Sequence, residues 1–215
     1  MRRKRGKAAK KAKAALTVAE DNDLVKAPHS FVFHRGHVRM SLKVLIQDFR
    51  KIMEPFTATS LKASEKNSLK DFVSIAGPLN VSHFLMFGMS PTSANLRIMR
   101  LARGPTMSFK VINFTLAKDV VSAQKRPNVN PKLFAHHPLL VLNGFGGQDG
   151  QPAPNHLKLI STMFQNMFPS ININKIAVGD IRRCLLLRYD AETDQIYLRH
   201  YSIKAVPVGK SFPCV

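Results

Sequence analysis

Two adjacent arginines stand directly before an apolar run late in the sequence. Arg182 and Arg183 precede Cys184 and the three leucines that follow it. A guanidinium group can donate paired hydrogen bonds to phosphate oxygens, and two of them at the mouth of a strand suit that contact. We therefore expect Arg182 and Arg183 to bind phosphate groups.

Aromatic and arginine side chains alternate in the strand expected to pair with that run. Tyr197, Arg199 and Tyr201 fall on one face of the strand, because side chains alternate with a period of two. Such a row can stack on unpaired bases. The alternative is that the tyrosines pack between the sheet and a helix, and the pattern alone favours this second interpretation.

A long stretch without acidic residues lies between Asp71 and Asp119. If its strand alternates regularly, Arg97 and Arg103 share one face and Arg100 lies on the other, so the three cannot all contact one ligand. Two interpretations stay open, namely contacts to an anionic ligand and ordinary solvated charge on a strand. The basic residues in this stretch are Arg97, Arg100, Arg103, Lys110 and Lys118.

Positive charge is present both at the N-terminal end and in the rest of the chain. Residues 2–13 hold eight lysines or arginines and no acidic residue, and of the net charge of +20 this leaves +12 elsewhere. A basic body behind a basic arm is typical of nucleic-acid binders, which gain affinity by releasing counterions from phosphates. The alternative for the arm is a solubilising or nuclear-import segment.

The sequence lacks the residue patterns that nucleotide binding, metal binding and acid–base catalysis would require. The segment from Gly209 to Ser211 is no phosphate-binding loop, because Lys204 stands where that motif requires glycine. His136 and His137 have no cysteine nearby, and the acidic residues show no acid–base spacing. We therefore predict that the chain is not an enzyme and needs no metal, cofactor or small-molecule substrate.

The composition limits the class of protein. With 215 residues and 45% hydrophobic content, the chain can bury a sizeable core. Two cysteines, Cys184 and Cys214, give no disulfide framework, which favours a reducing intracellular compartment. No apolar run approaches the roughly 18 residues of a membrane helix, so we expect no membrane partner.

Alternating helices and strands must position the arginines and tyrosines that are candidates for ligand binding. Residues 41–54, for example, place Leu42, Leu45, Ile46 and Phe49 on one helical face. The expected helices are 41–54, 69–76, 116–124 and 155–167. The expected strands are 30–33, 83–87, 96–101, 107–114, 138–143, and the hairpin of 181–189 with 195–204.

A faint internal repeat suggests two lobes. His83–Phe87 and Arg183–Leu187 each open a hairpin of similar size, and a helix precedes each of them. We expect an arm at 1–27, an α/β body at 28–210 and a short end at 211–215. Within the body, we expect an N-terminal lobe at about 28–106 and a C-terminal lobe at about 107–210.

An ordered set of short segments resembles the Brix-domain family of ribosome assembly factors, and within it the Peter Pan subfamily. The set covers about residues 28–210. The segments are Pro28–Phe33 with His34–Gly36, Arg50–Pro55, Lys66–Phe72, Ala76–Leu79, Arg103–Thr106, Pro138–Asn143, Met163–Pro169, Ile181–Cys184 and Arg199–Ile203.

The resemblance implies two α/β lobes, each similar to the anticodon-binding domain of class II synthetases. It also implies nucleolar work on precursors of the large ribosomal subunit, with ribosomal RNA and helical assembly proteins as partners. The RNA-recognition segment of the family maps onto Ile181–Tyr189, which gives that role to Arg182 and Arg183. The family continues with a long charged tail, so we expect a truncated or alternatively ended form and infer no tail-dependent contact.

The sequence thus predicts a non-enzymatic ribosomal-RNA-binding assembly factor in the nucleolus, acting as a scaffold or chaperone in precursor processing. Two alternatives are a basic ribosomal protein retained in mature particles and a metal-dependent RNA nuclease. The expected RNA-binding residues are Arg2, Arg3, Lys4, Arg5, Lys7, Lys10, Lys11, Lys13, Arg35, Arg97, Arg103, Arg182, Arg183 and Arg199.

Overall fold

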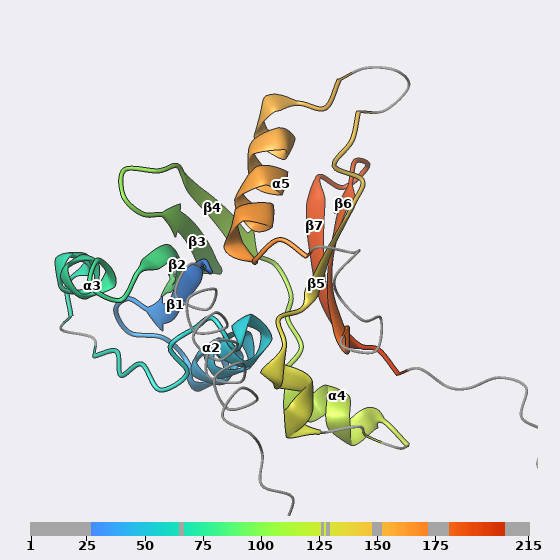
Figure 1. Cartoon of the computed structure of the whole chain (residues 1–215), viewed down its shortest axis with the longest axis horizontal. Coiled ribbons are helices and arrows are strands. Elements are labelled where there is room, and N and C mark those ends of the chain that lie inside the picture. The colour runs from blue at the N-terminus through green and yellow to red at the C-terminus, as the bar shows by residue number, and fades with distance from the viewer. Residues whose placement is uncertain are drawn as a thin grey trace, which may run out of the picture.

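In the described part of the chain, two β-sheets and four α-helices form the framework (Figure 1). The computed structural model describes residues 27–64, 67–125, 127, 130–147, 152–171 and 181–204. The elements are β1 (His29–His34), α2 (Met40–Met53), α3 (Leu69–Ala76), β2 (Val81–Met89), β3 (Ala94–Arg100), β4 (Thr106–Val111), α4 (Ala117–Ala123), the 3-10 helix η1 (Pro131–Ala135), β5 (Leu139–Asn143), α5 (Asn155–Met167), β6 (Arg183–Asp190) and β7 (Gln195–Ser202). Each helix and strand expected from the sequence is present, and η1 is an addition.

The two sheets share one construction. The first sheet has the order β1-β2-β3-β4 and the second has the order β5-β6-β7. In each sheet the first two strands are parallel and the next pair is antiparallel. Parallel neighbours need a crossover, which α2 and α3 provide in one lobe and α5 in the other. The expected α/β fold of two similar lobes is confirmed.

The boundary between the lobes lies later in the chain than the sequence suggests. A division between residues 106 and 107 would cut β4, which pairs with β3 from Met99 opposite Thr106 to Ala94 opposite Val111. A tight turn after β3 returns the chain along the same sheet, so β4 belongs to the N-terminal lobe. The expected boundary is corrected to a position after Val111.

Side chains alternate along β2, so the two faces of the first sheet belong to two different apolar clusters. Leu85 and Phe87 belong to a large cluster that also holds residues of α2, α5 and β6. Phe84 and Met86 belong to a smaller cluster on the opposite face, where Phe72 of α3 packs. Helix α5 lies between the two sheets in Figure 1. The large cluster, called the shared core below, therefore joins both lobes.

The apolar stripes of the two long helices lie in the shared core, as expected. Leu42, Leu45 and Ile46 of α2 are buried there, and so are Leu157 and Phe164 of α5. Burying an aliphatic or aromatic side chain of this size contributes about 1.5–3 kcal/mol. The stripes thus fix the orientation of both helices between the sheets.

The free edge of β1 is covered by the segment that follows α2. Arg50 donates from Nε to the carbonyl oxygen of Val32 at 2.9 Å. The backbone N–H of Ser30 donates to the carbonyl oxygen of Phe56 at 2.9 Å, and the Thr57 hydroxyl donates to the carbonyl oxygen of Ser30 at 2.9 Å. Covered edges resist pairing with other chains. This contact also fixes where the end of α2 lies.

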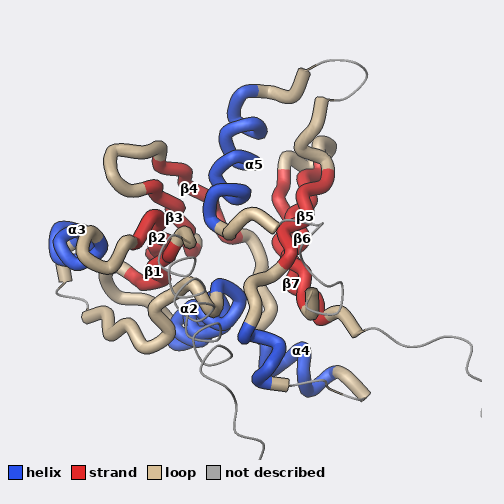
Figure 2. The backbone as a smooth tube through the Cα atoms, viewed as in Figure 1, coloured by secondary structure: helices blue, strands red, loops and turns tan. Residues whose placement is uncertain are grey.

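Figure 2 shows how the helices are distributed around the sheets. Helix α3 lies on the side of the first sheet that faces away from the second sheet, and Ser68 and Asp71 form a capping box at its start. None of the described helices combines the length and apolarity that crossing a membrane would require.

Candidate nucleic-acid interface

The second sheet turns one face toward the shared core and the other face outward. Leu185 and Leu187 of β6 are buried in the shared core, and Ile196 and Leu198 of β7 pack against it. The residues between them point the other way, because successive side chains alternate across a strand. In Figure 1, α5 lies on one side of this sheet, and no described helix lies against the other side.

We call this outward surface of the second sheet the open face. The strand register places Val141, Leu186 and Arg199 side by side across it. The exposed fractions are 37% for Val141, 37% for Tyr197 and 45% for Tyr201. The interpretation that the two tyrosines pack between sheet and helix is therefore wrong in the described structure. The open face consists of Leu139, Val141, Asn143, Cys184, Leu186, Arg188, Tyr197, Arg199 and Tyr201.

Each tyrosine of the open face has an arginine as a neighbour. The Arg199 guanidinium carbon lies 5.8 Å from the centroid of the Tyr197 ring, and Arg188 is the strand partner of Tyr197. Tyr201 follows Arg199 at the next position of the same face. The tyrosines are four residues apart, which is roughly 13 Å along a strand. Such a surface can stack two unpaired bases and bond the phosphates between them.

Among the described residues of the second sheet, negative charge lies at the hairpin turn. The Asp190 carboxylate accepts from the backbone N–H of Glu192 at 3.3 Å and from the Thr193 hydroxyl at 2.9 Å. These contacts hold the carboxylate at the turn end of the sheet. The centre of the open face thus combines aromatic rings with the positive charge of Arg188 and Arg199.

Comparison with known proteins agrees with this architecture. The model of the Brix domain matches residues 36–214 of the chain. The chain belongs to the Brix domain family. This Brix domain is similar to Protein Peter pan of Drosophila melanogaster, with 46% identity over 196 residues that cover 91% of the chain and 42% of that protein. The resemblance to the Peter Pan subfamily is confirmed.

Two further relatives are similar to most of the chain. The Peter Pan-like protein of Arabidopsis thaliana is 45% identical over 186 residues, which cover 86% of the chain and 52% of the relative. Ribosome biogenesis protein SSF1 of Saccharomyces cerevisiae is 40% identical over 205 residues, which cover 90% of the chain and 44% of the relative. The chain thus spans about half or less of the length of these relatives.

Arg183 occupies the joint between the two lobes of the Brix domain. Its side chain is 1% exposed. Nε donates to the carbonyl of His136 at 2.9 Å, and Nη1 donates to the carbonyls of Lys51 and Ile52 at 3.1 and 3.0 Å. Nη2 donates to the carbonyl of Glu54. Three of these acceptors belong to the end of α2, where helix carbonyls lack partners and favour a cation.

The expectation that Arg183 binds RNA is therefore corrected. Arg183 is in phase with Leu185 and Leu187, so its side chain points inward and its donors are occupied by carbonyls. Burial lowers its pKa to about 10, and the nearby Glu54 charge opposes that shift, so the guanidinium stays charged at neutral pH. Arg182 is half-buried and in phase with the open face. Its RNA-binding role stays a prediction.

Aromatic rings and two neutral histidines surround the Arg183 guanidinium. Its carbon lies 5.0 Å from the Phe134 ring centroid, and Phe134 stacks on His200 with centroids 6.2 Å apart. Burial and the charge of Arg183 lower the pKa of His200 to about 4, and the same causes lower the pKa of His137, with a further contribution from His136. The joint thus holds its histidines uncharged beside a buried cation.

Three other expected RNA-binding residues lie on the first sheet and are not brought together. Arg35 follows the end of β1, and Arg103 follows the end of β3. Since β1 and β3 run in opposite directions, these two arginines lie at opposite ends of the sheet. Arg97 is exposed on β3, on the face that carries Met99. Their contact with RNA stays a prediction.

The basic residues of the arm cannot be placed, because they lie outside the described residues. These residues are Arg2, Arg3, Lys4, Arg5, Lys7, Lys10, Lys11 and Lys13. Arg188 was not anticipated from the sequence, although its alternation with Cys184 and Leu186 signals that it shares their face. Within the described ranges, no three potential His, Cys, Asp or Glu ligands gather around a common point.

Replacing Arg183 should destabilise the fold. In Arg183→Met, four backbone carbonyls lose the hydrogen bond that the buried guanidinium donates to them, and we expect the free energy of unfolding to fall by about 3 kcal/mol or more. Arg182→Met is the matched control, and its effect should stay within about 0.5 kcal/mol. Urea denaturation followed by circular dichroism measures both. Equal stabilities for the two variants would contradict the structural role of Arg183.

Acid should destabilise the protein through its buried histidines. The folded chain keeps His83 and His200 neutral down to a pKa of about 4, whereas the unfolded chain binds protons near pH 6.5. Between these values the unfolded state holds more protons, so stability should fall as the pH drops from about 6.5 to about 4. Urea midpoints across this range should fall less steeply in His200→Gln than in the parent. Parallel slopes would refute this explanation.

Proposed function

We propose that this chain is a non-catalytic RNA-binding assembly factor for the precursor of the large ribosomal subunit. Two similar proteins of Saccharomyces cerevisiae are named ribosome biogenesis proteins SSF1 and SSF2. The observation that carries RNA binding is the open face, on which Tyr197 and Tyr201 flank Arg199. Rings and guanidinium groups in this order suit a single-stranded segment of ribosomal RNA.

The proposed contact needs no chemical step. An extended RNA strand along β7 would place one base on each tyrosine, and its phosphates would lie near Arg188 and Arg199. The aliphatic side chains of Val141 and Leu186 form an apolar floor beside them. By occupying the segment, the protein would keep it unpaired and delay its folding or cleavage, which is how a scaffold or chaperone acts in precursor processing.

Charge outside the open face would supply attraction without base specificity. The basic arm at residues 2–13 and the exposed Arg35, Arg97 and Arg103 are proposed to contact phosphates. Contacts to phosphates position a protein on RNA and weaken with salt, whereas base contacts carry sequence information. In this proposal selectivity lies in the folded lobes and the arm adds affinity.

The proposal places the protein in the nucleolus, where it would act with helical assembly proteins of the precursor particle. The described surface offers apolar side chains to such a partner on α3 and just after it. Val73, Ile75 and Leu79 are exposed there, on the side of the first sheet away from the shared core. A protein partner on this side would leave the open face accessible to RNA.

Removing the aromatic rings of the open face should weaken RNA binding. Tyr197→Ala and Tyr201→Ala should each lower affinity for a single-stranded ribosomal RNA fragment by roughly tenfold, because each ring stacks on one base. The matched Tyr→Phe variants keep the ring and should bind like the parent. Fluorescence anisotropy at fixed salt measures the affinities, with Phe114→Ala, an exposed aromatic outside the open face, as the control. Alanine variants that bind as tightly as the parent would rule out stacking.

The assembly role predicts where the protein sediments in cell extracts. The tagged chain should move with large-subunit precursors, recover precursor ribosomal RNA and be absent from translating ribosomes. Sucrose-gradient fractions probed for the tag and for precursor RNA provide the measurement. Presence in mature ribosomes would favour a retained ribosomal protein instead. Magnesium-dependent RNA cleavage that one aspartate substitution abolishes would favour a nuclease.

A further inference from the structure

The rows of the open face continue past Tyr197 to one more pair of residues. Asp190 and Gln195 lie opposite each other where the β6–β7 hairpin turns, next to the pair of Arg188 and Tyr197. Asp190 comes two positions after Arg188, and Gln195 comes two positions before Tyr197, so both side chains share the open face. The Cβ atoms of directly opposite residues lie about 4.5–5.5 Å apart. We call this carboxylate and this amide the turn pair.

The Tyr197 ring extends toward the turn pair. Its hydroxyl donates to Gln195 Oε1 at 3.4 Å. Arg199 lies two residues farther from the turn, and its guanidinium carbon is 5.8 Å from the centroid of the Tyr197 ring. A base stacked on Tyr197 would therefore have the turn pair at one edge and a cation for its phosphate in the opposite direction.

The polar atoms of the turn pair are held in place at the surface and keep hydrogen-bonding capacity. Asp190 Oδ1 accepts from the backbone N–H of Glu192 at 3.3 Å, Oδ2 accepts from the Thr193 hydroxyl at 2.9 Å, and both contacts are exposed. A carboxylate oxygen can accept two hydrogen bonds, so each of these oxygens can accept one more. Gln195 accepts through Oε1, which leaves its amino group as a donor.

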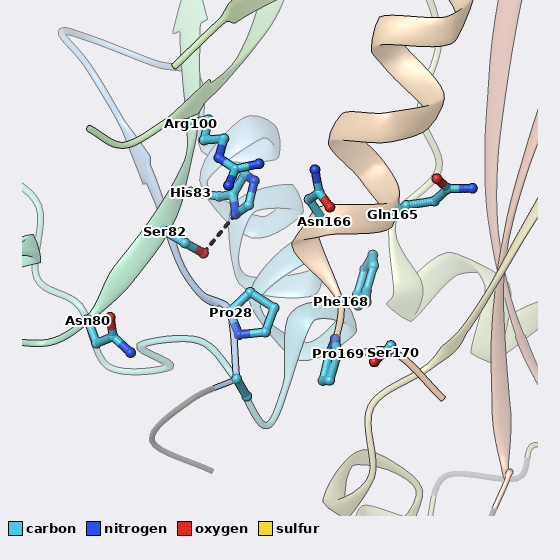
Figure 3. Close-up of a pocket in the computed structure, with 11 residues that line it drawn as sticks. Pro28, Asn80, Ser82, His83, Arg100, Gln165, Asn166, Phe168, Pro169 and Ser170 are labelled. Atoms are coloured by element: carbon cyan, nitrogen blue, oxygen red, sulfur yellow. Dashed lines mark hydrogen bonds between the residues drawn. The ribbon is translucent and has the colours of Figure 1, made fainter. Parts of the chain in front are cut away.

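A second polar site, the cavity of about 370 Å³ between the first sheet and the C-terminal end of α5, lacks such access (Figure 3). His83 is 1% exposed there, its Nδ1 lies 2.8 Å from the Ser82 hydroxyl, and its Nε2 is buried. A ligand in this cavity would meet the Arg100 guanidinium but could not reach the imidazole nitrogen. The turn pair differs because both its donor and its acceptors are at the surface.

Two acceptors beside a donor match the Watson–Crick edge of guanine. That edge presents the O6 acceptor next to the N1–H and N2–H donors, and proteins bond unpaired bases on it. The same edges of adenine, cytosine and uracil each present one donor group, so each can give a carboxylate one hydrogen bond. We propose that the turn pair selects guanine as the base stacked on Tyr197, with Asp190 accepting from N1–H and N2–H and Gln195 donating to O6.

This inference rests on the proposed function, because the guanine belongs to an RNA that the open face already holds. The two can fail separately. A full-length protein that binds neither a ribosomal RNA fragment nor a short oligonucleotide would refute the proposed function. A protein that binds RNA through Tyr197 without preferring guanine would refute only the role of the turn pair.

The test uses the full-length chain and short oligouridines that carry one central guanosine, adenosine, cytidine or inosine. Fluorescence anisotropy at fixed salt measures each affinity relative to oligouridine alone. We expect the guanosine oligonucleotide to bind roughly tenfold more tightly than those with adenosine or cytidine. Inosine lacks the N2 amino group but keeps O6 and N1–H, so it should lose most of that advantage.

Variants assign the preference to the two side chains. Asp190→Asn keeps an oxygen for the turn but places an amino group against the guanine donors, so the difference between guanosine and inosine should disappear. Gln195→Ala removes the donor to O6, which both bases carry, so it should weaken both and keep their difference. Asp194→Asn is the matched control, because it removes the same charge from a carboxylate that bonds Tyr189 instead. It should keep the preference.

Four results would overturn the proposal. The first is equal affinity of the parent for guanosine and inosine oligonucleotides, and the second is a difference that persists in Asp190→Asn. The third is an equal loss of preference in Asp194→Asn, and the fourth is such a loss in Arg100→Gln, which would place the base in the cavity of Figure 3. If Asp190→Asn fails to fold, the inosine comparison in the parent and in Gln195→Ala still decides the outcome.

Discussion

The buried guanidinium of Arg183 fixes the relation between the two lobes. It donates to carbonyls at the end of α2 in one lobe and to the His136 carbonyl just before β5 in the other. The last carbonyls of a helix need hydrogen-bond donors, and a buried cation needs acceptors around it. The Arg183 guanidinium and the end of α2 therefore satisfy one another. With α2 held in this place, its apolar stripe completes the shared core, and the open face must point away from that core.

Periodicity was sufficient to predict most of the framework. The stripes of α2 and α5 identify their buried sides because 3.6-residue spacing leaves little choice of face. The lobe boundary was not accessible in this way, because the assignment of β4 depends on a turn that returns the chain to β3 rather than on any property of β4 itself.

The arginine pair shows a second limit of prediction from the sequence. Arg182 and Arg183 are chemically identical, and only the phase of the following leucines distinguishes the inward residue from the outward one.

The sequence predicted which residues of the candidate interface lie together, but it did not predict that they are exposed. Alternation placed Tyr197, Arg199 and Tyr201 together, and the structure keeps them together. Whether a helix covers them depends on how many helices each lobe contains. The first lobe uses α3 to cover the outer face of its sheet. Of the described helices of the second lobe, α5 lies on the inner face of its sheet and α4 lies beyond the end of that sheet in Figure 1, so neither covers the outer face. Exposure of the tyrosines therefore follows from topology, which residue patterns do not encode.

The separation of Arg183 from its acceptors in the chain bears on synthesis by the ribosome. The guanidinium bonds carbonyls that precede it by 129 to 132 residues. A nascent chain that has emerged only as far as β4 can form the first sheet, but the end of α2 then lacks the Arg183 guanidinium and the shared core lacks the second sheet. Completion of the N-terminal lobe must wait for the strand that also builds the open face. Vectorial translation thus delays the joint until β6 emerges, and the aromatic surface follows with β7.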